Sequence, residues 1–219
     1  MSFLQDLASD EPVKAHRGLL RVARRMLPKI LPQILLCLQT LTSIPKSSRA
    51  PPTLLFTGHS AGGGVAALIC AHIRSHCPEI VRSFASIHCI TFAAPPVLAP
   101  LEAVSTALNP SESLTINIVN HGDIVPRAEK NYIRSLLQLY RERSEHISAD
   151  RWDFGQPTTF NYGQIVILKD VCPEDEEPRM HAYRASQGLW QTMAFGSIRA
   201  HPMNVYVQAV DGFMALHHS

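Results

Sequence analysis

The segment Gly58-His59-Ser60-Ala61-Gly62 fits the pattern G-x-S-x-G. It follows a short apolar segment, residues 53–57, and precedes an apolar helical segment, residues 65–77. A nucleophile at the tip of a sharp strand-to-helix turn needs strained backbone angles and little bulk beside it, which the glycines supply. The start of the helix favours negative charge, and the backbone N–H of Ala61 is placed to stabilise a tetrahedral oxyanion. The pattern indicates Ser60 as a nucleophile; the alternative is a glycine-rich turn with an incidental serine.

A serine nucleophile needs a base and an acid that orients the base. In this kind of turn the chain order is serine, acid, histidine. Asp123 lies 63 residues after Ser60, in a turn past an expected strand, and His201 follows 78 residues later, before an expected helix. The order predicts Asp123 as the acid and His201 as the base. The alternatives are that Asp123 only forms a turn and that His201 only starts a helix.

Eleven histidines compete for the role of the base. His121 is the second candidate, although it can simply belong to the acid's turn. His59 is adjacent to the serine, so we expect its side chain to leave the turn in another direction. His72 and His76 are four residues apart on an expected helix and lack a third ligand, which predicts a solvated helix face rather than a metal site.

The elements that must position these residues alternate between strands and helices. Strands rich in Ile, Val and Phe without polar alternation predict a mostly parallel sheet covered by helices on both faces, an α/β fold. The first long helix contains Pro28 and Pro32, which predicts a kink or two joined helices. The expected helices are residues 18–41, 65–77, 129–143 and 203–214, and the expected strands are residues 53–57, 87–93, 114–119, 164–168 and 190–195.

The composition narrows the class of protein. The 219 residues, 46% hydrophobic and 17% charged, predict a single folded domain rather than a disordered chain. A net charge of +2 gives no electrostatic reason to expect nucleic-acid binding. Five scattered cysteines without a CxxC pair exclude a zinc ribbon and a disulfide scaffold. The first twelve residues do not resemble a signal peptide and no apolar run spans a membrane, so the start as it stands predicts a cytoplasmic protein.

Four segments of the chain form a recognisable series: AHRGLL at residues 15–20, TGHSAGG at 57–63, NHGDIVPR at 120–127 and HPMNVY at 201–206. In this order they resemble the class 3 lipases, the fungal-lipase-like branch of the α/β-hydrolases that includes diacylglycerol lipases. They are similar to the family's V-H-x-G-F sequence, its nucleophile turn, its D-x-V-P-R acid turn and its H-x-M-x-x-Y base segment. The resemblance runs from about Asp6 to Phe213.

The resemblance implies an α/β-hydrolase fold over residues 1–219, a mostly parallel central sheet flanked by helices. It assigns Ser60 as nucleophile, Asp123 as acid and His201 as base, the residues that the chain order also selects. It implies hydrolysis of acyl esters of glycerolipids, triacylglycerol or diacylglycerol, without a metal or an organic cofactor.

One departure from the family pattern concerns the oxyanion hole. The family carries an R-G-T or R-G-S segment upstream of V-H-x-G-F, whose Thr or Ser supplies the second oxyanion donor. This sequence contains no such segment, which predicts an N-terminally truncated domain without its first strands. Losing one donor typically lowers the rate by about 10²–10³-fold. The alternative to an active lipase is therefore an impaired or non-catalytic lipase-like domain.

The remaining expectations concern substrate and partners. A thioester or feruloyl ester is an open alternative substrate, because these hydrolases share the triad. The helix expected at residues 129–143 carries Lys130, Arg134, Arg141 and Arg143 beside apolar positions. This pattern is compatible with peripheral contact with a membrane or lipid droplet, but a half-buried surface helix is the favoured interpretation.

Overall fold

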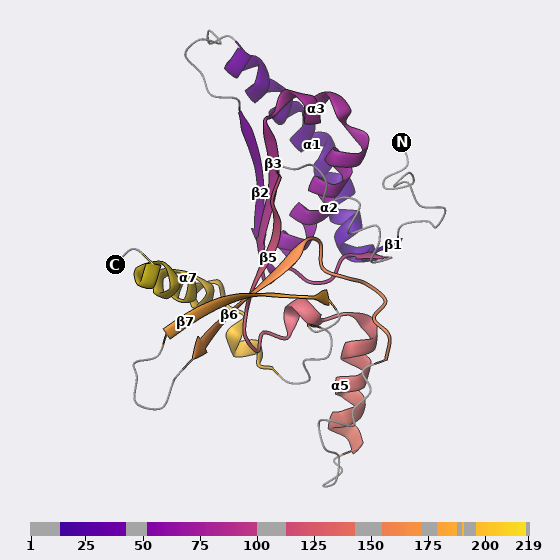
Figure 1. Cartoon of the computed structure of the whole chain (residues 1–219). Helices are drawn as coiled ribbons and strands as arrows, with labels where there is room; N and C mark the ends of the chain where they lie inside the picture. The colour runs from indigo at the N-terminus through magenta and orange to yellow at the C-terminus, as the bar shows by residue number, and fades with distance from the viewer. Residues whose placement is uncertain are drawn as a thin grey trace.

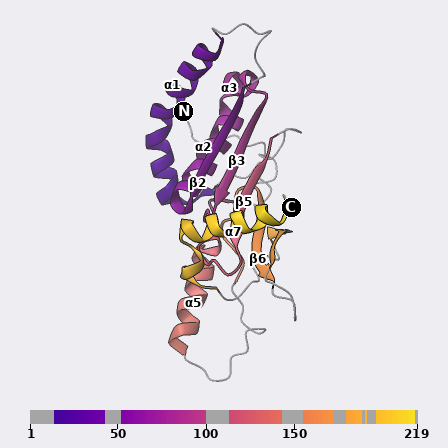
Figure 2. The same cartoon turned by 90° about the vertical axis from the view of Figure 1, so that its left-hand side faces the viewer.

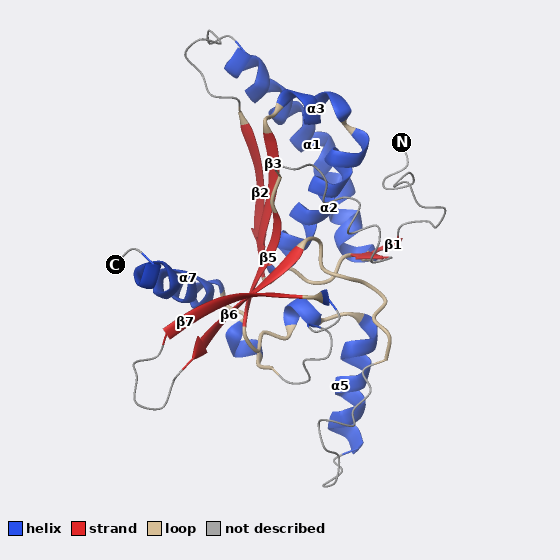
Figure 3. Ribbon diagram, in the orientation of Figure 1, coloured by secondary structure: helices blue, strands red, loops and turns tan. Residues whose placement is uncertain are grey.

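The computed structural model describes residues 14–42, 52–99, 113–142, 155–171, 179–187, 190 and 196–217. Its main sheet has five strands in the order β2–β3–β5–β6–β7, drawn as arrows in Figure 3. The first four are parallel and β7 runs antiparallel to β6. The strands are β2 (Thr53–His59), β3 (Ser86–Phe92), β5 (Thr115–Asn120), β6 (Gln164–Val171) and β7 (Arg179–Ala185).

Helices flank this sheet on both sides. Three of them, α1, α2 and α3, lie on one side of β2 and β3, whereas α7 lies on the other (Figure 1). The second view shows α2 between α1 and the strands (Figure 2). The helices are α1 (Arg17–Thr42), α2 (Ser60–His76), α3 (Pro78–Ser83), α5 (Lys130–Glu142) and α7 (Met203–His217), and a short pair joins β1 (Lys14–Ala15) to β4 (Leu98–Ala99).

Helix α1 is one helix of 26 residues that passes through Pro28 and Pro32. Each proline removes a backbone hydrogen bond and clashes with the preceding turn, which ordinarily costs about 3 kcal/mol. Packing offsets this cost, because four side chains on one face are buried against the core. These residues are Ala23, Leu27, Ile34 and Leu38. The two-helix alternative is therefore wrong. No helix among the described residues is long and apolar enough to cross a membrane.

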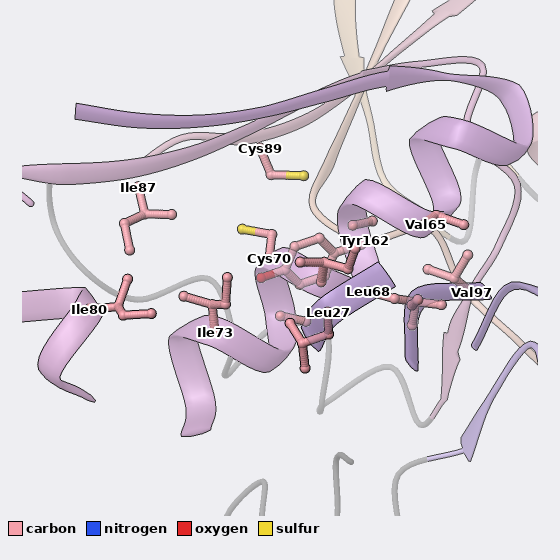
Figure 4. Close-up of a cluster of buried hydrophobic side chains, with 14 of the residues drawn as sticks. Leu27, Val65, Leu68, Cys70, Ile73, Ile80, Ile87, Cys89, Val97 and Tyr162 are labelled. Carbon is pink, nitrogen blue, oxygen red and sulfur yellow. The ribbon is translucent and has the colours of Figure 1, made fainter. Parts of the chain in front are cut away.

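The main core lies between α1, α2 and the sheet (Figure 4). Cys70 of α2 and Cys89 of β3 are buried within it as free thiols and lie near each other (Figure 4). Nearby, Arg74 donates to the Thr115 hydroxyl at 2.6 Å and to the Tyr162 hydroxyl at 3.1 Å. These bonds tie α2 to the start of β5 and to the segment before β6.

Two expectations about the sheet need correction. Strand β7 at Arg179–Ala185 was not expected; Trp190, the first residue of the strand expected at 190–195, is helical, and residues 191–195 lie outside the described part. Burial of alternate residues along β3 shows that helices do not cover both faces equally. On the side of α7, Leu55 and Leu114 are each 53% exposed. Among the described elements, α7 packs mainly on β7 and leaves β2 open on that face.

His72 also differs from expectation, because its side chain is only 6% exposed and stacks on His76 with ring centroids 4.7 Å apart. Burial, and to a lesser extent the charge of His76, lowers the pKa of His72 to about 4. An unfolded chain, with the ordinary pKa near 6.5, binds a proton below that pH that the folded chain does not bind. The free energy of unfolding should therefore decrease as the pH falls from 6.5 towards 4.

We expect the urea midpoint to be lower at pH 5 than at pH 7, and His72→Gln to reduce that difference. Other groups titrate in the same range, so the comparison is between variant and wild type. His181→Gln, a change on the exposed face of β7, is the matched control. An equal pH dependence in wild type and His72→Gln would contradict the prediction.

Candidate active site

Ser60 lies where β2 ends and α2 begins, with His59 as the residue that precedes the helix. Its φ of 56° lies in the left-handed region, which is costly for a residue other than glycine. Glycines allow the chain to fold back on itself here. A Cβ atom at Gly58 would lie 2.7 Å from the carbonyl carbon of Gly62, and one at Gly63 would lie 2.9 Å from the oxygen of Gly58. The strained turn therefore depends on Gly58 and Gly63, whereas a Cβ atom at Gly62 would have no neighbour within 4 Å among the described residues.

A chain of hydrogen bonds joins this serine to two residues from distant parts of the sequence. The Ser60 Oγ and the His201 Nε2 are 2.8 Å apart, and the His201 Nδ1 lies 3.0 Å from the Asp123 Oδ2. Asp123 follows β5 and His201 precedes α7, so three separate elements supply the three groups. In this geometry the imidazole can accept the serine proton at Nε2 while the carboxylate holds the proton at Nδ1.

Asp123 is fully buried, and its carboxylate has three partners. Its Oδ1 accepts the backbone N–H of Val125 at 2.9 Å, and its Oδ2 accepts the Tyr206 hydroxyl at 2.7 Å as well as His201. Burial and the nearby Asp123 charge raise the pKa of Tyr206, so its hydroxyl stays protonated and donates. The same hydroxyl accepts the N–H of Asn120 at 3.0 Å. Tyr206 therefore fixes the carboxylate relative to the end of β5.

A close contact between two glycines brings the acid turn and the base segment together. Ser197 donates its N–H to the Gly122 carbonyl at 2.7 Å, and Gly122 has a φ of 84°. A Cβ atom at Gly196 would collide with that same carbonyl oxygen. Beside them, the buried Arg127 guanidinium lies between Tyr132 and Trp190, at 5.4 and 5.2 Å from the ring centroids. Burial lowers the pKa of Arg127 from its ordinary value.

The His59 side chain contacts the segment that carries the base. Its Nε2 lies 2.8 Å from the backbone carbonyl oxygen of His201, and the two rings pack with centroids 4.7 Å apart at 33°. The His59 ring also meets Tyr206 edge-on at 5.8 Å. The residue before the serine thus holds the segment that carries the histidine.

The family model of class 3 lipases matches residues 2–132, more than half of the chain. This chain belongs to the class 3 lipases. It is 32% identical over 119 residues to the chloroplastic phospholipase A1 PLIP1 of Arabidopsis thaliana, an alignment that covers 54% of this lipase and 17% of PLIP1.

Solved structures support the fold of this lipase. The Rhizomucor miehei lipase in its propeptide complex matches with a TM-score of 0.54 at 18% identity, over 92% of this chain and 53% of that one. A triacylglycerol lipase whose catalytic centre is formed by a serine protease triad matches with a TM-score of 0.53 at 16% identity, over 90% of this chain and 60% of that one. The fold is that of an α/β-hydrolase, and this chain spans roughly half to three fifths of these neighbours.

The structure of this chain brings Ser60, Asp123 and His201 together, as the chain order predicted. His121, the second candidate base, is exposed and its backbone bonds to Leu168 of β6. Burial, Lys169 and Arg127 lower the pKa of His121. Within the described part of the lipase, no cluster of three or more His, Cys, Asp or Glu side chains could hold a metal ion. Sequence reasoning missed the positions of His59 and Gly196; the only signals were a histidine beside the nucleophile and a glycine shortly before the base.

Tyr206→Phe should weaken both the lipase site and the fold. The change removes one donor to the Asp123 carboxylate and leaves the buried Asn120 N–H without its acceptor. We expect the free energy of unfolding to fall by about 1–3 kcal/mol and kcat for a soluble ester to fall roughly tenfold. Urea denaturation and steady-state kinetics measure the two effects. Tyr183→Phe, on the exposed part of β7, is the control and should change neither.

His59→Phe should lower kcat while leaving KM nearly unchanged. Phenylalanine keeps a ring against His201 but cannot bond to its carbonyl oxygen, so the imidazole loses one positional restraint. A single hydrogen bond of this kind corresponds to a decrease of about two- to tenfold. His181→Phe is the control, and restoration of kcat by His59→Gln would support the hydrogen bond over the ring as the cause. A kcat equal to wild type in His59→Phe would contradict the prediction.

Proposed function

We propose that this class 3 lipase hydrolyses acyl esters of glycerolipids, triacylglycerol or diacylglycerol, with Ser60, His201 and Asp123 as its catalytic triad. The observation that carries the proposal is the continuous hydrogen-bond chain from the Ser60 Oγ through the His201 ring to the buried Asp123 carboxylate. Membership of a lipase family supports ester hydrolysis as the reaction class, and it supports lipid esters as the substrate class.

In the proposed mechanism, the Ser60 Oγ attacks the acyl carbonyl carbon while His201 Nε2 takes its proton. The tetrahedral intermediate then collapses, and His201 gives this proton to the departing alcohol oxygen, leaving an acyl-serine ester. A water molecule then gives a proton to His201 and attacks the acyl carbon. The bond between this carbon and the Ser60 Oγ breaks, His201 returns the proton to the Oγ, and the fatty acid leaves. Asp123 keeps the proton on Nδ1 and stabilises the imidazolium that forms twice in the cycle.

The oxyanion of the intermediate needs donors that are fixed in advance. Ala61 is the second residue of α2, so its N–H has no acceptor within the helix and belongs to the positive end of the helix dipole. We assign Ala61 as one donor. The family places the second donor upstream of the segment around His16, and we assign no described residue to that role.

The experiment that tests this proposal is labelling of folded protein with a fluorophosphonate probe, followed by mass-spectrometric mapping of the adduct. Such probes react with serines that an adjacent base activates. We expect one adduct, on Ser60, together with turnover of p-nitrophenyl butyrate. A missing adduct in protein that unfolds cooperatively, or an adduct spread over surface serines, would overturn the assignment.

A second candidate function is a non-catalytic lipase-like domain that binds lipid without hydrolysing it. The observation in its favour is that β2, which carries Ser60 at its end, is an edge strand of the described sheet. An oxyanion site with a single donor loses about 10²–10³-fold in rate. Lipid binding by protein that neither labels at Ser60 nor turns over a soluble ester would select this function.

A further inference from the structure

The outward face of α1 combines exposed basic and exposed apolar side chains. Arg21, Arg25 and Lys29 are exposed and four residues apart, so they form one row along the helix. Val22 and Met26 lie beside this row and are 44% and 42% exposed. Further along the helix, Leu35 and Leu36 are 47% and 55% exposed. The opposite face of α1 is buried in the core, so this pattern belongs to the side of the helix that faces away from α2.

The charge on α1 has one sign only. Within Arg17–Thr42 the sequence contains five arginines and lysines and no aspartate or glutamate. Like charges four residues apart repel each other, and α1 contains no acidic residue that could neutralise them. An anionic surface would neutralise this row and at the same time cover Val22 and Met26. Basic residues on the polar part of a helix with apolar side chains beside them are the pattern of helices that lie in a membrane interface.

The basic half of α1 lies next to the candidate site. The Leu19 side chain packs at the first turns of α2, where a Cβ atom at Gly64 would lie 2.8 Å from the Leu19 Cδ1. Gly64 is four residues after Ser60 on the same helix. A surface that held residues 21–29 would therefore lie across α1 from the helix that begins at Ser60.

We propose that the outward face of α1 binds the surface of an anionic lipid bilayer. The inference rests on the proposed function, because the bilayer that α1 binds would be the source of the lipid ester substrate. A nucleic acid would neutralise the basic row but would not cover the exposed apolar residues beside it. A lipid surface would do both, so we infer a lipid surface as the partner. Helix α5 has a smaller face of the same kind, with exposed Lys130, Arg134 and Arg141 beside Ile133 and Leu137. It lacks the single-sign charge of α1, since it ends in Glu142.

The test is vesicle flotation of the full chain with phosphatidylcholine alone and with phosphatidylcholine mixed with phosphatidylserine. Wild-type protein should float with the anionic vesicles only, and less so as salt increases. The triple variant Arg21→Gln, Arg25→Gln, Lys29→Gln should bind about 100-fold more weakly. The matched control, Lys14→Gln, Arg82→Gln, Arg184→Gln, removes the same charge from exposed positions elsewhere and should bind nearly as wild type does.

Three results would overturn the proposal. The first is no binding of wild type to anionic vesicles; the second is equal loss in the α1 variant and the control, which would indicate only net charge. The third is loss in the α5 variant Lys130→Gln, Arg134→Gln, Arg141→Gln with none in the α1 variant. Turnover of a soluble p-nitrophenyl ester separates this proposal from the function itself. The α1 variant should keep this turnover. If wild-type protein binds the vesicles but does not turn over the ester, only the proposed function is contradicted.

Discussion

Replacing Ser60 with alanine should abolish ester hydrolysis, lowering kcat for p-nitrophenyl butyrate by about 10³-fold or more. The change removes the only atom of this side chain that the His201 Nε2 contacts, at 2.8 Å, and no other described serine bonds to that ring. The fold should be almost unaffected, because alanine experiences the same backbone strain as serine at a φ of 56°. Turnover and urea denaturation of the same preparation measure both effects.

Two companion variants make this result interpretable. Ser83→Ala, at an exposed serine that bonds only to the Glu79 carbonyl within its own helix, should keep full activity. Ser60→Gly should be as inactive as Ser60→Ala but more stable, by about 1 kcal/mol, because glycine adopts a positive φ without strain. Residual turnover of Ser60→Ala within tenfold of wild type would show that the nucleophile lies elsewhere.

Asp123→Asn should lower kcat by about 10⁴-fold with little change in the size of the buried side chain. The carboxylate accepts a proton-bearing His201 Nδ1 at 3.0 Å, whereas an amide can turn its own N–H groups towards that nitrogen. The imidazole would then carry its proton on Nε2. A protonated Nε2 cannot accept the proton of Ser60. The loss of charge also removes the stabilisation of the imidazolium.

The control for this variant is Asp211→Asn, an exposed aspartate on α7. It should leave kcat and the urea midpoint unchanged. Asp123→Asn should react with the fluorophosphonate probe far more slowly than wild type, because the attack of Ser60 on the probe needs the same proton transfer to His201. Wild-type labelling rates in Asp123→Asn would remove Asp123 from the proposed mechanism.

The local features of the site were predictable because short-range sterics decide them. An apolar strand, a glycine two residues before Ser60 and a helix after it specify a tight turn, and the structure has that turn. The acid and the base were predictable as residue types in a known chain order. The ends of parallel strands meet at one edge of the sheet, so Asp123 after β5 lies near Ser60 after β2.

Other features could not be predicted because they depend on contacts between segments far apart in the chain. Strand β7 was not predicted, since its residues alternate weakly in polarity and form a strand through pairing with β6. The burial of His72 depends on the helix and strands packed around it, and the continuity of α1 through two prolines depends on its buried face. In each case tertiary packing outweighed a local propensity.

The sequence alone determined the family, the nucleophile turn and the identity of the groups that can transfer a proton. Only the tertiary structure decided how those groups are held. Tyr206 donates to the Asp123 carboxylate, 83 residues earlier in the chain, and His59 bonds to the carbonyl of His201, 142 residues later. Gly196 has no side chain, so the acid turn can pack directly against the base segment. These contacts depend on the folding of β5 and α7 against the end of β2. No sequence periodicity encodes such contacts, because hydrogen bonds across an assembled sheet edge form only after the chain has closed on itself.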